Sequence, residues 1–81
     1  MTTKQKYDKV FMDSLSLKES ELTPDLSYNK VDSWDSLGHM ALVTGLEEAF
    51  GVTLETDDVI NLSSYLTGQD VLRKYGVNFQ A

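Results

Sequence analysis

The 81-residue chain contains no cysteine and only one proline. Without cysteine it cannot form a disulfide, a zinc–thiolate site or a thiolate nucleophile of its own, so its fold must rest on apolar packing. No apolar run approaches the ~18 residues of a membrane-spanning helix, and the first residues lack the apolar stretch of a secretory signal. We therefore expect a cytoplasmic protein with no membrane span, and the length predicts a single domain over residues 1–81.

Positive charge is scarce and unevenly distributed. The chain has 7 Lys and Arg against 13 Asp and Glu, which gives a formal net charge of −6. No Lys or Arg lies between Lys30 and Arg73. This excludes the clustered positive charge with which proteins bind the phosphates of nucleic acids. The acidic second half is either an ordinary solvated face or an anionic surface that attracts basic partners.

Helical periodicity dominates the sequence, and it predicts an all-α fold. Four segments show the spacing or the capping signals of a helix: Lys4 to about Leu15, Ser36 to about Phe50, Thr56 to Ile60, and Ser63 or Ser64 to Tyr75. Because a lone helix cannot bury its apolar stripe, three long helices and one short helix predict a small four-helix bundle. Gly38 and Gly45, inside the second predicted helix, each cost ~1 kcal/mol relative to alanine, which suggests a close backbone approach by some other group. Gly45 and Gly68 would also loosen the packing between the helices.

Residues 16 to about 35 form a long loop between the first two helices. Turn-forming residues such as Pro24 and Asn29 interrupt any regular pattern, although one short helix could begin at Ser20 or Thr23. Leu26 and Trp34 are the kind of apolar residues that would anchor such a loop to the core. Loops of ~20 residues are uncommon in compact domains and are often functional.

Ser36 is the most prominent polar residue, because it follows this loop and begins the strongest helix. The ordinary interpretation is an N-cap, for which Ser is strongly preferred. A hydrolase in which His39 activates Ser36 is disfavoured, because the chain has no G-x-S-x-G turn and is too small for a cleft. Covalent modification is the other hypothesis: a phosphodiester on Ser36 would lie at a helix N-terminus, which favours an anion.

A metal site is not predicted. Asp57 and Asp58 lack the spacing of an EF-hand loop. One histidine and scattered carboxylates do not form a convincing zinc or di-metal set.

The segment Asp35-Ser36-Leu37 is similar to the D-S-L attachment motif of the acyl carrier proteins, which bind phosphopantetheine. The resemblance covers about Lys4 to Tyr75, and it includes the E-E-A-F-G sequence that ends the second predicted helix. It implies that a carrier-protein synthase (a phosphopantetheinyl transferase) attaches 4′-phosphopantetheine to Ser36. The arm would hold an acyl or aminoacyl group as a thioester, and the chain itself, a monomer, would not be an enzyme.

The same resemblance implies partner enzymes, namely an acyl-loading ligase or transferase and downstream acyltransferases or synthases. The residues that would meet them are acidic or apolar: Asp35, Leu37, Met40, Glu47, Glu48, Asp57 and Asp58. Carriers of fatty acid synthesis usually have more acids on the second helix, whereas this chain has Gly38 and His39 directly after the motif. That difference favours a specialised polyketide, lipid or surface-glycan pathway.

Two alternatives stay open at this stage. The chain could be an unmodified acidic interaction domain that has the carrier fold. If it does carry an apolar cargo, that cargo could lie between the helices, although the ordinary interpretation of the same residues is a packed core. The residues concerned are Leu42, Leu46, Ile60, Leu62 and Leu66.

Overall fold

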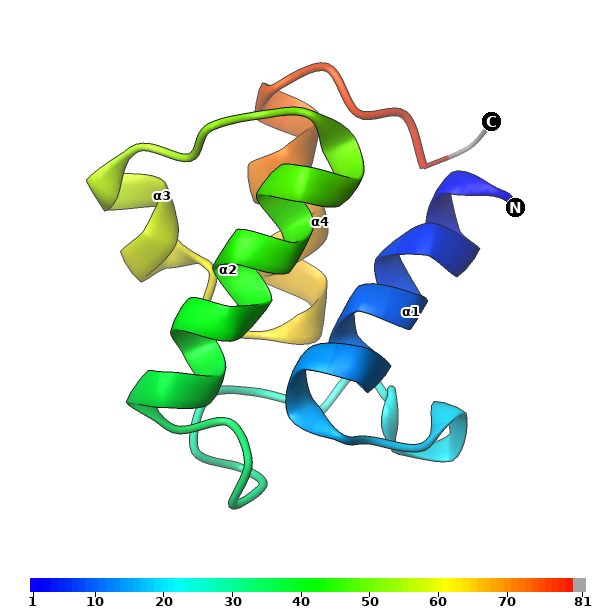
Figure 1. Ribbon diagram of the computed structural model, residues 1–81, viewed down its shortest axis with the longest axis vertical. Helices are drawn as coiled ribbons and strands as arrows, with labels where there is room; N and C mark the ends of the chain where they lie inside the picture. Colours follow the sequence, from blue (N-terminus) through cyan, green and yellow to red (C-terminus); the bar gives the residue numbers. More distant parts are fainter. Residues whose placement is uncertain (80–81) are drawn as a thin grey trace.

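The structure, a computed structural model, describes residues 1–79, and its regular elements in that range are helices, with one isolated β-bridge between Ser27 and Ser64 (Figure 1). It contains α1 (Thr3–Leu15), a 3-10 helix η1 (Glu19–Glu21), α2 (Ser36–Phe50), α3 (Thr56–Asn61) and α4 (Tyr65–Lys74). The predicted all-α bundle of three long helices and one short helix, with a long loop after the first, is confirmed. None of the helices in this range is long and apolar enough to cross a membrane.

Local capping signals account for the helix boundaries. The Thr2 hydroxyl accepts the Gln5 N–H, and the Gln5 side chain accepts the Thr2 N–H, so α1 begins with a reciprocal capping box. α2 ends where Gly51 adopts a left-handed φ of 65°, as expected for a glycine in that position. α4 is capped by Ser64, whose hydroxyl accepts the Thr67 N–H, which decides between the two serines predicted for this end.

Aromatic side chains from three parts of the chain form the centre of the core. The rings of Tyr7 and Phe11 on α1 contact Tyr65 on α4, and Phe11 also meets the indole of Trp34 from the loop, with ring centroids 4.9–5.5 Å apart. α1 lies beside α2, and α3 lies on the opposite side of α2 (Figure 1). The core therefore sits between α1, α2 and α4, and α3 lies at its edge.

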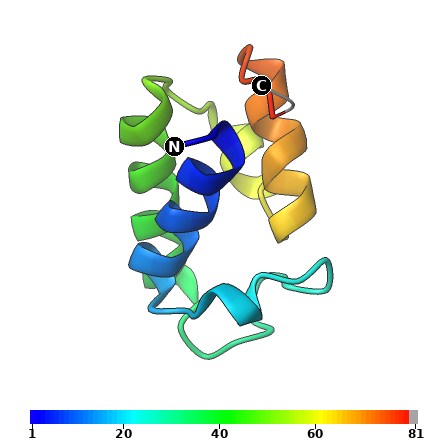
Figure 2. The same cartoon turned by 90° about the vertical axis from the view of Figure 1, so that its right-hand side faces the viewer.

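The long loop runs under one end of the helices and is tied to the start of α4 (Figure 2). Tyr65 N–H donates to the Leu26 carbonyl at 2.9 Å, and Tyr28 N–H donates to the Ser63 carbonyl at 2.8 Å. Leu26 and Trp34 are buried, as expected of loop anchors. These contacts hold the end of the loop that leads into Ser36.

The glycines within the helices tighten the packing, so the expectation that they loosen it is wrong. A Cβ on Gly68 would lie 2.3 Å from the hydroxyl oxygen of Tyr7, which is fully buried and donates to the Tyr65 carbonyl. A Cβ on Gly45 would lie 2.9 Å from Val10 on α1. Each glycine permits a close approach between helices that a larger residue would prevent.

Candidate functional site

Ser36 is the first residue of α2 and is exposed to solvent. It is not the N-cap, so that part of the sequence prediction is wrong. Asp35 takes the cap position instead: its backbone is extended, and its carboxylate accepts the Gly38 N–H at 2.8 Å. Within residues 1–79, the Ser36 hydroxyl has no hydrogen-bond partner. The side chain is therefore available for chemistry without loss of the helix cap.

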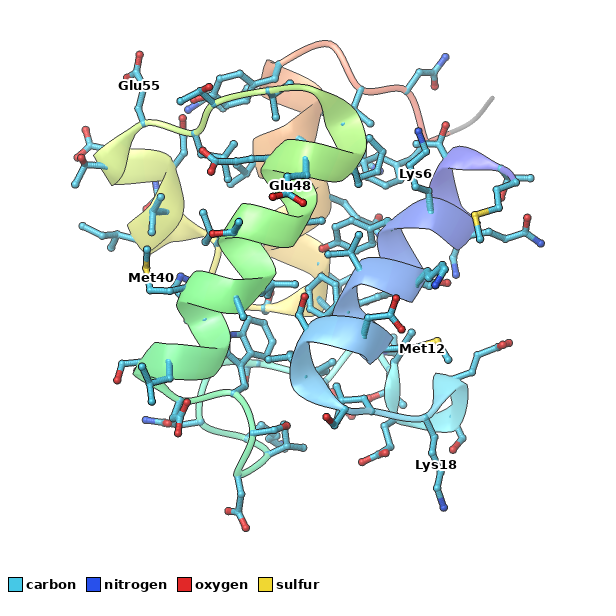
Figure 3. The ribbon with its side chains drawn as sticks, in the orientation of Figure 1. Lys6, Met12, Lys18, Met40, Glu48 and Glu55 are labelled. Carbon is cyan, nitrogen blue, oxygen red and sulfur yellow. The ribbon has the colours of Figure 1, made fainter. Side chains whose placement is uncertain are left out.

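An apolar groove of about 330 Å³ lies beside Ser36. Its walls come from the loop, from α2 and from the segment that joins α3 to α4: Tyr28, Ser36, His39, Met40, Ile60, Leu62 and Ser63. Met40 extends from α2 toward α3, across this groove (Figure 3). The groove offers an apolar surface directly next to an exposed hydroxyl.

The five residues that could have enclosed a cargo separate into three groups. Ile60 and Leu62 line the groove. Leu42 and Leu46 are completely buried in the core, so they fill the interior instead of leaving space in it. Leu66 lies about half exposed on α4 and is not part of the groove wall. The groove is thus a surface feature next to Ser36, and sequence reasoning found only part of it.

His39 has both ring nitrogens engaged. Trp34 Nε1–H donates to His39 Nδ1 at 3.0 Å, and His39 Nε2 lies 2.8 Å from the carbonyl oxygen of Val59. Because Nδ1 accepts a hydrogen bond, the proton is on Nε2 and is donated to that carbonyl. Neither nitrogen is available to activate Ser36, which removes the base that a hydrolase would need. The ring is half-buried.

Of the seven predicted partner-binding residues, five are exposed: Asp35, Leu37, Met40, Glu48 and Asp57. Leu37 is 82% exposed and Met40 is 54% exposed, both unusual for apolar residues. Glu47 is half-buried, and its carboxylate accepts the Leu54 N–H at 2.8 Å. Sequence reasoning assigned Ile60 to a cargo cavity, yet its side chain is 68% exposed. It adds a third large apolar residue to the surface near Ser36.

Asp58 is not a surface acid, and its prediction as a partner contact needs correction. It is 3% exposed, and its carboxylate lies 2.5 Å from Lys74 Nζ and accepts the Tyr75 hydroxyl at 2.5 Å. These two hydrogen bonds lower the pKa of the Asp58 carboxyl below its ordinary value of 3.8. The Tyr75 hydroxyl also accepts the Glu55 N–H at 3.1 Å. Asp58 therefore fastens α3 to the end of α4.

Asp58 should make the stability of the protein depend on acid pH. Because the pKa of Asp58 is lowered in the folded state, its contribution to the free energy of unfolding is complete above pH 3.8. This contribution is lost as the pH falls through the folded-state pKa, which lies below 3.8. We expect the melting temperature, followed by circular dichroism, to drop more steeply between about pH 5 and pH 2 in the wild type than in Asp58→Asn. The exposed neighbour provides a matched control, and Asp57→Asn should follow the wild-type curve. Parallel curves for wild type and Asp58→Asn would contradict the assignment.

Comparisons with known proteins identify relatives named acyl carrier protein. The chain is 34% identical over 58 residues to a protein named acyl carrier protein from Nitratidesulfovibrio vulgaris, a match that covers 72% of this chain and 76% of that protein. It is 33% identical over 60 residues to a protein of the same name from Rubrobacter xylanophilus, with 74% of each chain covered. No protein-family model and no solved structure matches the chain.

Proposed function

Because the chain belongs to the acyl carrier protein family, we propose that it holds acyl or aminoacyl intermediates as thioesters on a 4′-phosphopantetheine arm attached to Ser36. The relatives are named acyl carrier protein, and His39, three residues from Ser36, has both ring nitrogens engaged in other hydrogen bonds. The observation that carries the proposal is the hydroxyl of Ser36, which is exposed beside an apolar groove and makes no hydrogen bond within residues 1–79. The arm supplies the thiol that a cysteine-free chain lacks.

The attachment reaction requires only a reachable oxygen from this chain. Ser36 Oγ attacks the phosphorus that carries the pantetheine portion of coenzyme A, and a phosphodiester bond forms. The bond to the second phosphate breaks, adenosine bisphosphate leaves, and the hydroxyl proton passes to a base of the synthase. The new anion lies in the first turn of α2, where the helix dipole favours negative charge.

The groove fits the apolar portion of such an arm. Met40 and Ile60 offer exposed carbon surface within reach of Ser36, and no charged side chain lines this groove. Leu42 and Leu46 are fully buried in the packed core. We propose that the arm and a short cargo lie in the groove at the surface.

The surface around Ser36 suits basic partner enzymes. Leu37, Met40 and Ile60 present apolar side chains, and the acids Glu48 and Asp57 are exposed on the same two helices, α2 and α3. Figure 3 shows Met40 and Glu48 on α2. Apolar contacts surrounded by complementary charge are typical of specific protein interfaces. We propose that the synthase, an acyl-loading ligase or transferase and the downstream acyltransferases or synthases meet this face, in a cytoplasmic pathway that is specialised for polyketide, lipid or surface-glycan assembly.

Incubation with coenzyme A and a carrier-protein synthase of broad specificity tests both parts of this proposal. The intact mass should rise by one phosphopantetheine group, and fragmentation should place the group on Ser36. The initial rate should fall as salt is added, because screening weakens attraction between an acidic face and a basic enzyme. An unchanged mass, with a known carrier modified in the same tube, would exclude the carrier function. A rate independent of salt would exclude the proposed role of the acids.

A further inference from the structure

α3 is too short to be stable without contacts from the rest of the protein. It has six residues, and its N-cap, Glu55, makes no capping hydrogen bond through its side chain. Helices of this length are not stable alone in water. The only fully buried side chain that α3 contributes is that of Asp58, which is charged. Contacts from neighbouring elements must therefore fix where α3 lies, and with it the Ile60 side of the groove.

Two polar connections reach α3 from different directions. The Asp58 carboxylate joins it to Lys74 and Tyr75 at the end of α4. On the other side, His39 on α2 donates from Nε2 to the Val59 carbonyl. Val59 lies in the last turn of α3, where carbonyl groups have no partner within the helix. His39 therefore supplies both a cap for α3 and a direct connection between α2 and α3.

The loop before Ser36 fixes the ring of His39. Trp34 is completely buried, and its indole N–H, which needs an acceptor there, donates to His39 Nδ1. The planes of the two rings are 17° apart, with centroids separated by 6.3 Å. Tyr28 meets the His39 ring edge-on at 5.6 Å. The ring is thus held on two sides, and its single proton is directed at Val59.

We propose that His39 is a positioning residue that sets the separation between α2 and α3, and thereby the width of the groove beside Ser36. The groove is lined by His39 itself and by Ile60, the neighbour of the residue that His39 binds. The consequence for a bound arm rests on the proposed function at Ser36. The effect on α3 does not, because every contact involved is already present in the unmodified chain.

Three substitutions at His39 test its two hydrogen bonds individually. His39→Phe keeps an aromatic ring and removes both bonds. His39→Gln can place an amide N–H near the Val59 carbonyl, at the position of Nε2, but leaves no acceptor at the position of Nδ1 for Trp34. His39→Asn can accept from Trp34 but does not reach Val59. Thr44→Ala, at an exposed position on α2, is the matched control.

Amide hydrogen exchange measures the local stability of α3. The Leu62 N–H, which donates to the Asp58 carbonyl, should exchange roughly tenfold faster in His39→Phe and His39→Asn. It should remain near the wild-type rate in His39→Gln and Thr44→Ala. The Phe11 N–H on α1 should be unaffected in all of them. A Leu62 rate that does not change in His39→Phe would overturn the inference, as would equal rates in the Asn and Gln variants.

Nitrogen-15 spectra of the histidine supply a readout that general loss of structure would not mimic. The wild type should show a protonated Nε2 and an unprotonated Nδ1, and the Trp34 indole signal should shift in His39→Phe and His39→Gln but not in His39→Asn. A proton on Nδ1 would contradict the proposal.

In protein loaded with phosphopantetheine, contacts between the arm and Ile60 should weaken in His39→Phe. If the wild type cannot be loaded, the proposed function fails while the exchange result still decides this inference.

Discussion

Ser36→Ala should eliminate attachment of the phosphopantetheine arm and leave the fold almost unchanged. The substitution removes only the hydroxyl group, which makes no hydrogen bond within the described residues 1–79. The helix cap comes from Asp35 and survives the change. Because alanine is a better helix former than serine by about 0.5 kcal/mol, the variant should be as stable as the wild type. Intact-mass analysis after incubation with synthase and coenzyme A should show no gain.

Ser33→Ala is the matched control for this experiment, because it removes a serine from the same end of the loop, outside the groove wall. It should gain the mass of one arm, like the wild type. A mass gain that persists in Ser36→Ala would show that another residue is modified. If Ser36→Ala loses the arm but still binds its partners and supports the pathway fully, the chain acts as an unmodified interaction domain.

Most of the fold was predictable because the signals for it are local. Apolar spacing located the helices, and the residues that end them, such as Gly51 and Ser64, act on the adjacent turn. The exposed position of Ser36 at the start of α2 was likewise predictable from its place after a long loop, while its role as the attachment site stays a prediction. The N-cap was assigned one residue too late, since Asp35 and Ser36 are both good capping residues and the pattern alone does not choose between them.

The arrangement around α3 could not be predicted, because it depends on contacts between residues far apart in the sequence. Asp57 and Asp58 are adjacent acids in one short helix, and only the position of Lys74 at the end of α4 determines that Asp58 is buried. His39 likewise acquires its role from Val59, which lies 20 residues away. Ile60 faces solvent because α3 lies at the edge of the core. Periodicity in a six-residue helix is too short to reveal any of this.

The sequence shows glycines within the helices but does not show which neighbouring group requires them. Each such residue costs ~1 kcal/mol relative to alanine, which indicated a close approach by some other group. The structure identifies that group at Gly38: a Cβ there would lie 1.9 Å from the backbone oxygen of Ser33 and 3.1 Å from the Leu15 side chain. The segment that leads into Ser36, the proposed modification site, thus lies directly against the first turn of α2.

Gly38→Ala should therefore be the most disruptive single-methyl addition near Ser36. An ordinary contact begins at 3.4 Å, so the Ser33 carbonyl would have to move by about 1.5 Å, from its 1.9 Å position. That movement would displace the adjacent Trp34, whose buried indole holds His39, and would disturb the Asp35 cap. Overpacking of this kind costs about 3 kcal/mol or more, which exceeds the ~1 kcal/mol gain in helix propensity. We expect a net loss of about 2 kcal/mol in the free energy of unfolding.

Gly45→Ala in the same helix provides the comparison. Its added Cβ would meet only side-chain atoms, Val10 Cγ1 at 2.9 Å and Ser14 Oγ at 3.1 Å, which can yield by a few tenths of an ångström. The gain in helix propensity should then offset most of the strain, so that stability stays within about 1 kcal/mol of the wild type. Urea denaturation of both variants measures the difference, and the loading rate at Ser36 should fall at least tenfold in Gly38→Ala alone. Equal stability and equal loading in the two variants would show that the Ser33 backbone yields freely, and that the loop does not fix the serine in place.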